Sequence, residues 1–449
     1  MSLKAVLLGM LIALAATSAS PMAASAQSSG SSTGTFASPV DDSTPAAATL
    51  GPGTRITTGN WQQYRNFMSD GLQALFQGKY LWKIPAEAEV FVGRTRINPP
   101  PKTFIEATEK YSGQVKLEEL PDGGLTLSNY QGGYPFPIPS EPHKGWKILA
   151  DVWYRYFPNP TVIIHGGGCT LDQSGSTNCT SGDIVYRQLS FNTDPGVPAT
   201  LPGGEGKFFT QWYMLTEPEQ KRYTASLQIT YTDLQRNEDL YAFIPQLRRY
   251  QPVSTLGRCS MVEGVDITQE DYRSGFDSNL TELKVDYLGE KKVIALILNK
   301  IPFGHGLDAF LMPLGWPKPS WGDWQLRDVY VISVSKLPSK EKGYCYGKRV
   351  MYVDKTTFAP YWEELYDAKM QPWKIVGLYP NTVDVPGIGK VDTSGSVIYS
   401  FWDIQRNHAS FVMDPTSNNF PFYAGDQVPK EYLDITKYST PGGLNEIMR

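Results

Sequence analysis

"RYTASLQITYTD", which runs from Arg222 to Asp233, is the clearest structural signal in the chain. Its residues alternate between two faces. One face carries Tyr223, Ala225, Leu227, Ile229 and Tyr231, and the other carries Arg222, Thr224, Gln228 and Thr230. Large apolar side chains at every second position are typical of a β-strand that buries one face. The stretch therefore predicts a strand in a sheet with one apolar side.

Similar short apolar runs recur through the rest of the chain. They are "KFFTQWYMLT", "DLYAFIPQL", "KKVIALILNK", "LRDVYVISVSKL", "KRVMYVDKTT", "WKIVGLYP" and "GSVIYSFWDI". They are separated by loops instead of the helices of roughly 10–15 residues that connect parallel strands, which favours an antiparallel sheet. Since few helices are available to cover its apolar face, the sheet has to curl. We expect an α+β fold, mainly antiparallel β, with one large curved sheet that forms a half-barrel.

Two helices are predicted ahead of most of these strands. "NWQQYRNFMSDGLQALFQGK" (Asn60–Lys79) places large apolar side chains at helical spacing, after an asparagine that suits the N-cap position. "KTFIEATEKYSGQVKL" (Lys102–Leu117) has a similar stripe and follows the breaker "PPP". Both stripes need a broad apolar surface to pack on. We expect both helices to pack on the concave side of the curved sheet.

The N-terminus has the pattern of a cleaved signal peptide. Lys4 precedes the apolar run "AVLLGMLIALAA" (Ala5–Ala16), and small residues lead to "ASA" at Ala24–Ala26. The alternative, a membrane anchor, is disfavoured because this run is shorter than the ~20 residues that span a bilayer. We expect residues 1–26 to be removed and the protein to be exported to the periplasm.

The mature chain is expected to consist of a linker and one domain. Residues 27–53 are mostly Ser, Thr, Ala, Gly and Pro, which cannot bury enough apolar surface to become ordered. Residues 54–449 are expected to form a single domain with a loop insertion near residues 162–205. No internal repeat is visible, which disfavours a propeller. The net charge of −4, with both signs spread along the chain, disfavours a nucleic-acid partner.

The four cysteines permit three disulfide pairings. We favour Cys169 with Cys179, because they are close in sequence, and Cys259 with Cys345, because both lie beside strand-like runs. A metal site is the alternative, but no CxxC or HxxxH spacing supports it. The histidines stand singly, at His143, His165, His305 and His408. We therefore expect no metal site and no cofactor.

"VIIHGGGCT" (Val162–Thr170) resembles the oxyanion-hole loop of some esterases. That chemistry also needs a nucleophile in a G-x-S-x-G turn between a strand and a helix. The motif occurs only at Gly30–Gly34, inside the predicted linker. The glycines are therefore predicted to form a flexible loop that is tethered by a disulfide.

Two groups of acidic residues raise the possibility of glycoside hydrolysis, which uses a pair of facing carboxyl groups. They are Glu263, Asp266, Glu270 and Asp271 in "EGVDITQED", and Glu363, Glu364 and Asp367 in "YWEELYD". A chain with 45 acidic residues offers many such groups, so we expect solvated loops or helix N-termini here. No catalytic residue is assigned, and the protein is not expected to be an enzyme.

"DLYAFIPQLRRY" (Asp239–Tyr250) ends on two adjacent arginines, Arg248 and Arg249. If the strand continues, their side chains point to opposite faces, and one of them can bind an anionic head group at the mouth of an apolar cavity. A structural ion pair with Asp266 or Asp271 is the other interpretation, and both stay open. The candidate ligand-binding residues of this region are Tyr241, Phe243, Arg248, Arg249, Asp266 and Asp271.

"SNYQGGYPFPIP" (Ser128–Pro139) combines turn-forming glycines with rigid prolines, so that no regular element runs through it. We interpret it as a structural corner at the rim of a cavity. Tyr134 and Phe136 are expected to plug the edge of the core there, and they complete the set of candidate ligand-binding residues.

Several motifs along the chain together resemble an exported Gram-negative family, Domain of Unknown Function family 1329. They are "EATEKYSGQVKL", "LSNYQGGYPFP", "DLYAFIPQLRRY", "EGVDITQEDY", "RDVYVISVSKLP" and "YGKRVMYVDKTT". This family is described as related to the outer-membrane lipoprotein-sorting carriers of the LolA and LolB type. The resemblance implies a half-barrel closed by helices around an acyl chain or another greasy ligand. The chain departs from the small carriers in its length and in the "HGGGC…C" segment.

The sequence thus predicts a periplasmic carrier or binding protein for a lipid or another hydrophobic ligand. Binding would follow from the removal of apolar surface from water. Two alternatives stay open. One is a periplasmic hydrolase that acts on glycan or lipid through His165 or the carboxylates, and the other is a cell-envelope scaffold that partners an outer-membrane or transport protein.

Overall fold

A computed structural model describes residues 34–36, 45–47, 49–262, 264–298, 311–341, 344–414, 423–424 and 428–448. All of them belong to one compact unit, Gly34–Arg449. The predicted signal peptide and most of the predicted linker lie outside the described residues. So do Glu263 and His305.

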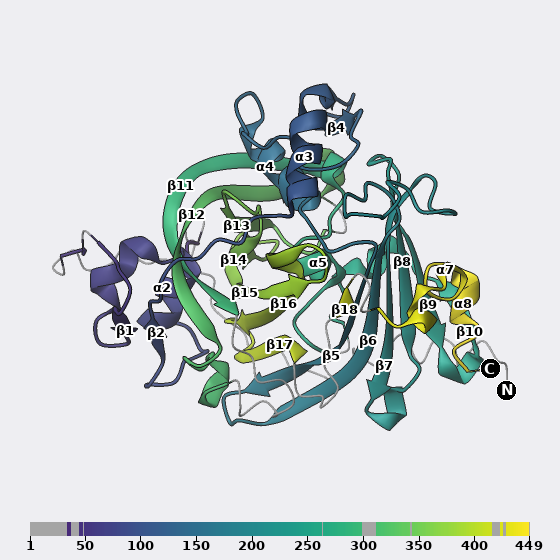
Figure 1. The fold of residues 1–449 in the computed structure, drawn as a ribbon. Coiled ribbons are helices and arrows are strands. Elements are labelled where there is room, and N and C mark those ends of the chain that lie inside the picture. Colours follow the sequence, from purple (N-terminus) through teal and green to yellow (C-terminus); the bar gives the residue numbers. More distant parts are fainter. Residues whose placement is uncertain are drawn as a thin grey trace. The chain divides into compact units, whose positions relative to one another are not determined.

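The unit is built on a 14-stranded sheet (Figure 1). In sheet order the strands are β10 (Arg249–Pro252), β9 (Asp239–Ile244), β8 (Ala225–Tyr231), β7 (Lys207–Glu217), β6 (Thr177–Gln188), β5 (Thr161–Asp172), β17 (His408–Asp414), β16 (Gly389–Asp403), β15 (Pro372–Val385), β11 (Leu283–Leu298), β12 (Gly322–Lys336), β13 (Lys348–Asp354) and β14 (Pro360–Tyr366), with β18 (Tyr423–Ala424) paired to β5. Neighbouring strands run antiparallel, apart from one parallel contact in the described residues between Leu298 and Asn381. The predicted fold class, α+β with a large curved antiparallel sheet, is confirmed.

The sheet turns back on itself between β11 and β15. The first residues of β15 pair with β14, and Asn381 further along β15 reaches Leu298 of β11, so strands β11 to β15 form a closed ring. From β15 the sheet continues through β16 and β17 to the open strands β5 to β10. In Figure 1, β11 and β12 form a long arc, β13 to β16 lie inside it, and β5 to β8 stand on the other side of the short helix α5 (Tyr272–Gly275).

A stack of indole rings fills the space between β12, β14 and β16. It consists of Trp316, Trp324, Trp362 and Trp402, which we call the tryptophan core. Adjacent ring centroids are 6.1–6.4 Å apart, and the planes are within 30° of one another. All four side chains are buried, and the indole N–H of Trp362 donates a hydrogen bond of 2.8 Å to the Ile294 carbonyl of β11. This part of the fold is densely packed.

Strand β8 lies within the stretch Arg222–Asp233, so that predicted strand is confirmed. Its face with Leu227 and Ile229 packs in one cluster with Tyr438 and Leu444 of the C-terminal helices α7 (Ile435–Tyr438) and α8 (Pro441–Leu444). On the opposite face, the amide Nε2 of Gln228 donates a 2.8 Å hydrogen bond to Asp277. The apolar face that alternation predicts is therefore covered by the end of the chain.

The predicted helix Asn60–Lys79 is in fact two elements, a 3₁₀-helix (Trp61–Phe67) and α2 (Asp70–Gln77). The Ser69 hydroxyl accepts a 3.1 Å hydrogen bond from the Leu72 N–H and thereby caps α2, so a new helix starts at this point. The Gly71 N–H of α2 donates a 2.7 Å hydrogen bond to Glu364 of β14. The first of the two predicted helices is thus anchored on the sheet.

The second predicted helix is shorter than expected, because α3 (Lys102–Tyr111) ends before Gly113 and the chain then enters β3 (Lys116–Glu119). Strand β3 pairs with β4 (Leu125–Ser128), and β1 (Arg55–Thr57) pairs with β2 (Glu89–Phe91). The sequence analysis did not identify α4 (Lys144–Trp153), which packs against β11. A Cβ atom on Gly145 would lie 2.8 Å from the Val285 carbonyl, so glycine permits this close approach.

The loop insertion expected near residues 162–205 is wrong for its first part. Residues Thr161–Gln188 form the hairpin β5–β6 inside the sheet, and the irregular chain starts only after Gln188. A Cβ atom on Gly167 would lie 1.7 Å from the Thr180 carbonyl, so only glycine permits this close pairing. The glycines therefore serve strand pairing, and they do not form the flexible loop that was predicted from them.

Both disulfides of the favoured pairing are present. Cys169 and Cys179 are direct partners in the β5–β6 register, and Cys259 is bonded to Cys345. Within the predicted linker, Phe36 is fully buried and packs edge-on against Tyr366 with a centroid distance of 5.0 Å. None of the helices in the described part of the chain has the length and apolar character needed to cross a bilayer.

Candidate ligand-binding pocket

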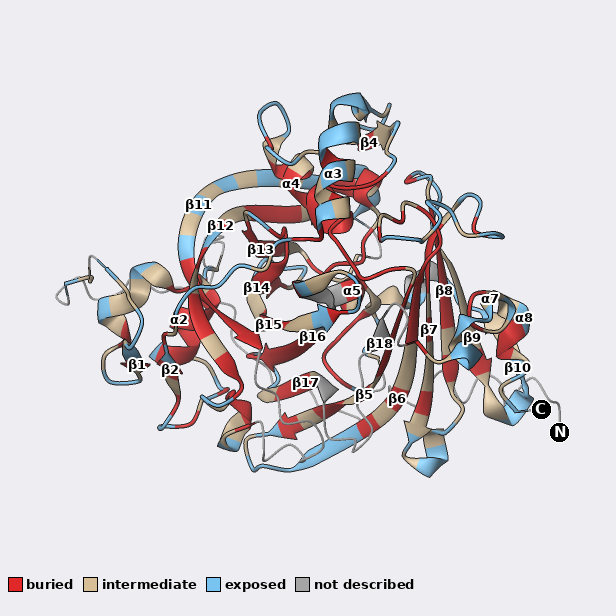
Figure 2. Ribbon diagram, in the orientation of Figure 1, coloured by how far each residue is buried: buried red, intermediate tan, exposed pale blue. Residues whose placement is uncertain are grey.

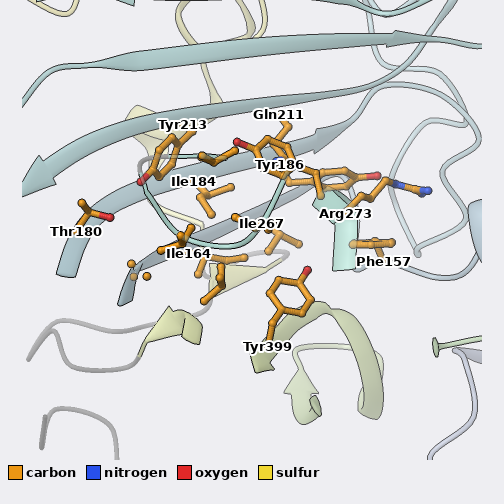
Figure 3. Close-up of a pocket in the computed structure, with 18 residues that line it drawn as sticks. Phe157, Ile164, Thr180, Ile184, Tyr186, Gln211, Tyr213, Ile267, Arg273 and Tyr399 are labelled. Carbon is orange, nitrogen blue, oxygen red and sulfur yellow. The ribbon is translucent and has the colours of Figure 1, made fainter. Parts of the chain in front are cut away.

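An apolar pocket with a volume of about 110 Å³ lies against the inner surface of β5, β6 and β7 (Figure 3). Its facing wall is formed by residues 264–273, which we call the covering segment, together with Tyr399 of β16 and Val412 of β17. Most of the side chains that line it are aliphatic or aromatic. The pocket therefore offers an apolar surface to a ligand.

Strand β5 supplies one wall through its even-numbered residues. Val162 and Ile164 face the pocket, and they are followed on the same face by Gly166 and Gly168. The two glycines present no side chain to the pocket. A Cβ atom on Gly168 would lie 3.0 Å from Cγ1 of Val265, so glycine permits the close approach of the covering segment to β5. The glycines of "VIIHGGGCT" thus shape this wall of the pocket.

The covering segment contributes Val265, Ile267, Tyr272 and Arg273 to the pocket. A capping box joins Thr268 and Asp271, and the Thr268 N–H donates a 2.8 Å hydrogen bond to the Asp271 carboxylate. These short-range contacts keep the segment compact over the pocket without a long helix or strand.

Buried ion pairs fix the covering segment to its surroundings. The carboxylate of Asp271 lies 2.6 Å from the guanidinium of Arg349, which also pairs with Glu363 at 2.5 Å. Glu270 pairs at 2.7 Å with Arg258, next to the Cys259–Cys345 disulfide. Removal of one charge from such a network leaves its partner buried and uncompensated.

The pocket has a partly exposed mouth and a buried end. Gln211 and Tyr213 of β7 and Val262 are partly exposed, whereas Tyr186 and Arg273 are buried. Figure 3 shows Tyr213 at one end of the row of side chains and Arg273 at the other. The only formal charge that lines the pocket in the described residues is therefore at its buried end.

Arg273 is 4% exposed, and its guanidinium lies over aromatic rings. Its centre is 4.9 Å from the ring centroid of Trp153 and 4.8 Å from those of Phe157 and Phe209. One terminal nitrogen donates a hydrogen bond to the Trp153 carbonyl, while Nε and Nη2 make none with the described residues. The guanidinium thus has two nitrogen atoms, Nε and Nη2, that can donate hydrogen bonds to a ligand at the buried end of the pocket.

A second polar group lies beside the covering segment and consists of Asp266, Asp403 and His408. Their potential ligand atoms are within 4.8 Å of one another. Among the described residues, this is the group that could hold a metal ion. Nδ1 of His408 is 2.8 Å from the Asp266 carboxylate, and this hydrogen bond raises the pKa of His408. The ammonium of Lys374 donates a 2.7 Å hydrogen bond to the Asp266 carbonyl and adds a positive charge nearby. The Asp266 carboxylate and carbonyl and the His408 ring therefore already have hydrogen-bond partners, as in a polar network that stabilises the fold.

All eight predicted ligand-binding residues are in the described part of the chain, and none of them lines the pocket. Tyr134 is buried against Phe104, and the Phe136 N–H donates a 2.9 Å hydrogen bond to Asp151 of α4. Both therefore occupy a corner of the core, as interpreted from "SNYQGGYPFPIP", but this corner does not line the pocket. Tyr241 and Phe243 pack in the cluster under the C-terminal helices.

The remaining four predicted residues do not meet. Arg248 and Arg249 are exposed at the turn between β9 and β10, and Arg248 has a positive φ of 48°. Asp271 pairs with Arg349 instead of either arginine, while Asp266 accepts hydrogen bonds from His408 and Ser410. The sequence motifs suggested that these residues form one site, but the structure places them apart.

The residues considered for hydrolysis have other partners. His165 lies on the face of β5 opposite Val162 and Ile164, and its Nδ1 is 2.5 Å from the Asp183 carboxylate of the neighbouring strand. Glu270 is held by Arg258. These groups therefore do not face one another across the pocket.

The pocket residues were missed for identifiable reasons. The alternation in Val162–Gly168 is a usable signal, but the glycines were interpreted as a loop. Arg273 lies in "QEDYRSG", where no periodicity or motif marks it, and its position depends on contacts with Trp153 and Phe208 far away in the sequence. No rule based on spacing along the chain identifies such a residue.

Solved structures with a similar arrangement have low identity to this chain. A domain assigned to outer-membrane lipoprotein sorting, from Vibrio parahaemolyticus, is 14% identical with a TM-score of 0.43, over 64% of this chain and 95% of that one. A DUF1329 family protein from Desulfovibrio piger is 13% identical with a TM-score of 0.44, over 66% and 98%. A LolA superfamily protein from Nitrosomonas europaea is 15% identical with a TM-score of 0.37, over 64% and 96%.

No curated protein matches the chain. The model of one family matches most of it, and this family is the one that the sequence motifs resemble. By the match over residues 55–440, the chain belongs to the family "Protein of unknown function (DUF1329)".

Proposed function

We propose that this protein binds a hydrophobic ligand, such as part of a lipid, in the pocket between β5–β7 and the covering segment. The observation that carries the proposal is the apolar pocket itself, with its partly exposed mouth and buried end. The side chains around this space are mostly aliphatic or aromatic, so it offers a ligand apolar surface that is removed from water on binding.

The size of the pocket limits what it holds in this conformation. Its volume of about 110 Å³ is below the roughly 150 Å³ of an engineered cavity that binds benzene. The pocket therefore accepts the end of a hydrocarbon chain or a small ring. Each buried methylene contributes roughly 0.8 kcal/mol, so a few methylenes give modest and reversible binding. A longer chain would need the covering segment to move.

The proposed location is the periplasm, in agreement with the predicted signal peptide. Two disulfides support this location, because disulfides persist in oxidising compartments. A carrier in this compartment would exchange its ligand with a membrane or an envelope protein. An outer-membrane or transport protein remains the expected partner, as the sequence predicts.

The first test is direct. Native mass spectrometry of gently purified protein should show a bound lipid or another apolar small molecule, and calorimetric titration should show binding of octanol. Gly168→Val fills the pocket next to Val265 and should weaken octanol binding by roughly tenfold, which corresponds to the loss of about two buried methylenes.

Gly113→Val is the matched control, because a Cβ atom on Gly113 meets no other atom within 4 Å and Gly113 does not line the pocket. This variant should bind octanol as the wild type does. If the wild type binds no apolar compound, or if both variants bind equally well, the proposal is wrong.

A further inference from the structure

The buried end of the pocket contains a cation, Arg273, that has no counter-ion among the described residues. Arg273 is 4% exposed, and no carboxylate of a described residue forms an ion pair with it. Its Nε and Nη2 atoms donate no hydrogen bond within the described residues. Burial of a charge is costly unless the charge is paired. The guanidinium therefore lacks the partner that a buried arginine normally has.

The nearby charges do not supply this partner. Arg155 is buried beside Arg273 and donates a hydrogen bond to its carbonyl, so the local charge is more positive still. Asp277 is close enough for Arg273 to lower its pKa, but its carboxylate is hydrogen-bonded to Gln228. Glu363 is engaged with Arg349. The region around the guanidinium thus has an excess of positive charge.

Aromatic rings keep water away from the guanidinium, and the Arg273 side chain lines the buried end of the pocket. The rings of Trp153, Phe157, Phe208 and Phe209 lie with their centroids 4.8–5.2 Å from its centre. Tyr186 lines the pocket next to it, and Arg273 lowers the pKa of the Tyr186 hydroxyl against the larger effect of burial, so the two polar groups lie close together. A planar guanidinium binds a carboxylate through two parallel hydrogen bonds, which are strong where water is excluded.

We propose that the pocket binds a small apolar carboxylic acid with its head inward, so that the carboxylate pairs with Arg273 and the hydrocarbon part points toward Tyr213 at the mouth. This inference rests on the proposed function and narrows its ligand class. A pocket of about 110 Å³ holds the head and the first few methylenes of such an acid, and the rest of the chain extends from the mouth.

The test compares octanoate with octanol, two ligands that share their chain and differ in the head group. A carboxylate that enters an apolar pocket loses its hydration, so octanoate should bind more tightly than octanol only if a cation receives it. Calorimetric titration of the wild type should show this preference for octanoate. In Arg273→Met the affinity for octanoate should fall roughly tenfold to a hundredfold, which is the range for a lost charged hydrogen bond, while the affinity for octanol stays within about twofold.

Arg273→Lys is the second variant, because it keeps the charge if the methionine variant folds poorly. It should retain the preference for octanoate in part, since lysine offers a point charge without the planar fork. Circular dichroism and thermal unfolding of each variant check the fold. Gly168→Ala, at the pocket wall, should weaken both ligands to the same extent and leave their ratio unchanged.

The possible failures are distinguishable. If octanol binds the wild type as tightly as octanoate, or if Arg273→Met weakens both ligands equally, the head-inward inference is overturned while the hydrophobic pocket stands. If neither compound binds the wild type, the proposed function fails and the inference fails with it.

Discussion

Trp402 and Tyr399 are three residues apart on β16, and their side chains point to opposite faces of the strand. On the face of Trp402, four indoles stack between the strands and leave the space filled. On the face of Tyr399, β5, which is separated from β16 by β17, presents Gly166 and Gly168, and a pocket remains. Figure 2 shows that the strands on both sides of β16 are largely buried. Burial alone therefore does not distinguish a region that stabilises the fold from one that can receive a ligand.

The difference between the two faces lies in what covers them. The tryptophan core lies between β12, β14 and β16, strands of the sheet that are held by continuous backbone hydrogen bonds. The pocket is covered by residues 264–273, which are held by side-chain ion pairs and follow the disulfide-bonded Cys259 in the chain. Elements with few backbone hydrogen bonds open at lower free-energy cost than the strands of a sheet. We therefore expect any movement that admits a ligand to occur in the covering segment.

The largest effect is expected from the tryptophan core. Trp362→Ala removes a fully buried indole and its hydrogen bond to the Ile294 carbonyl. The free energy of unfolding should fall by about 3–5 kcal/mol, the usual cost of such a cavity. Urea denaturation measures the change. A loss of less than about 1 kcal/mol would show that the tryptophan core does not stabilise the fold as its packing implies.

The second prediction concerns the disulfide next to the covering segment. The bond between Cys259 and Cys345 closes a loop of 86 residues, whereas that between Cys169 and Cys179 closes one of 10. The double substitution Cys259→Ser with Cys345→Ser opens the longer loop and should cost about 4.5 kcal/mol of stability, against about 3 kcal/mol for the hairpin pair. Octanol binding should weaken more in the first double variant, because its bond lies next to the cover. Equal binding in the two double variants would contradict this assignment of the covering segment.

Glu363 and Glu364 are adjacent on β14, so their side chains lie on opposite faces of the strand. The dependence of stability on pH compares the surroundings of these two carboxyl groups. Burial raises the pKa of Glu364 to about 8, and its partners, the Gly71 N–H and the Tyr352 hydroxyl, are neutral. Because the pKa is higher in the folded state than its model value of 4.5, the stability contribution is complete below about pH 4.5 and is lost as the pH passes about 8.

Glu364→Gln should remove this loss. Its free energy of unfolding should match that of the wild type near pH 5 and exceed it near pH 9 by at least about 1 kcal/mol, the value of one pKa unit. Glu363→Gln is the comparison. Since Glu363 pairs with Arg349, that substitution should destabilise the protein at both pH values. A Glu364→Gln variant whose stability parallels that of the wild type across this range would contradict the raised pKa.

The smallest effects are expected from replacing isoleucine with valine at one fully packed position and at one position that lines the pocket. Ile375 is fully buried on the side of α2, whereas Ile164 is 6% exposed and lines the pocket. Ile375→Val should cost about 1 kcal/mol, near the middle of the range for this change. Ile164→Val should cost clearly less, because the lost methyl group already borders empty space. Similar losses at the two positions, measured by urea denaturation, would argue against the pocket.

The sequence predicted the strands well because alternation is a local property. The stretch Arg222–Asp233 contains β8, and the two favoured disulfides are present. It could not predict which face of each strand would stay open. The apolar face of β8 is covered by Tyr438 and Leu444, which lie about 200 residues later in the chain.

The tryptophan core and Arg273 were not predictable for the same reason. Trp316, Trp324, Trp362 and Trp402 have no regular spacing and meet only when distant strands pair. The exposed Arg248 and Arg249 attracted attention because they are adjacent in sequence, whereas the buried Arg273 stands alone in its stretch. Ligand-binding residues that are assembled from several elements leave no signature along the chain.

The most direct test of the central claim is a crystal structure determined under xenon pressure, because xenon occupies empty apolar cavities. The account predicts a xenon atom bounded by Ile164, Tyr186 and Val265, and none within the tryptophan core. A crystal of the same protein with no xenon between β5–β7 and the covering segment would show that the pocket is not available to an apolar guest and would contradict the account.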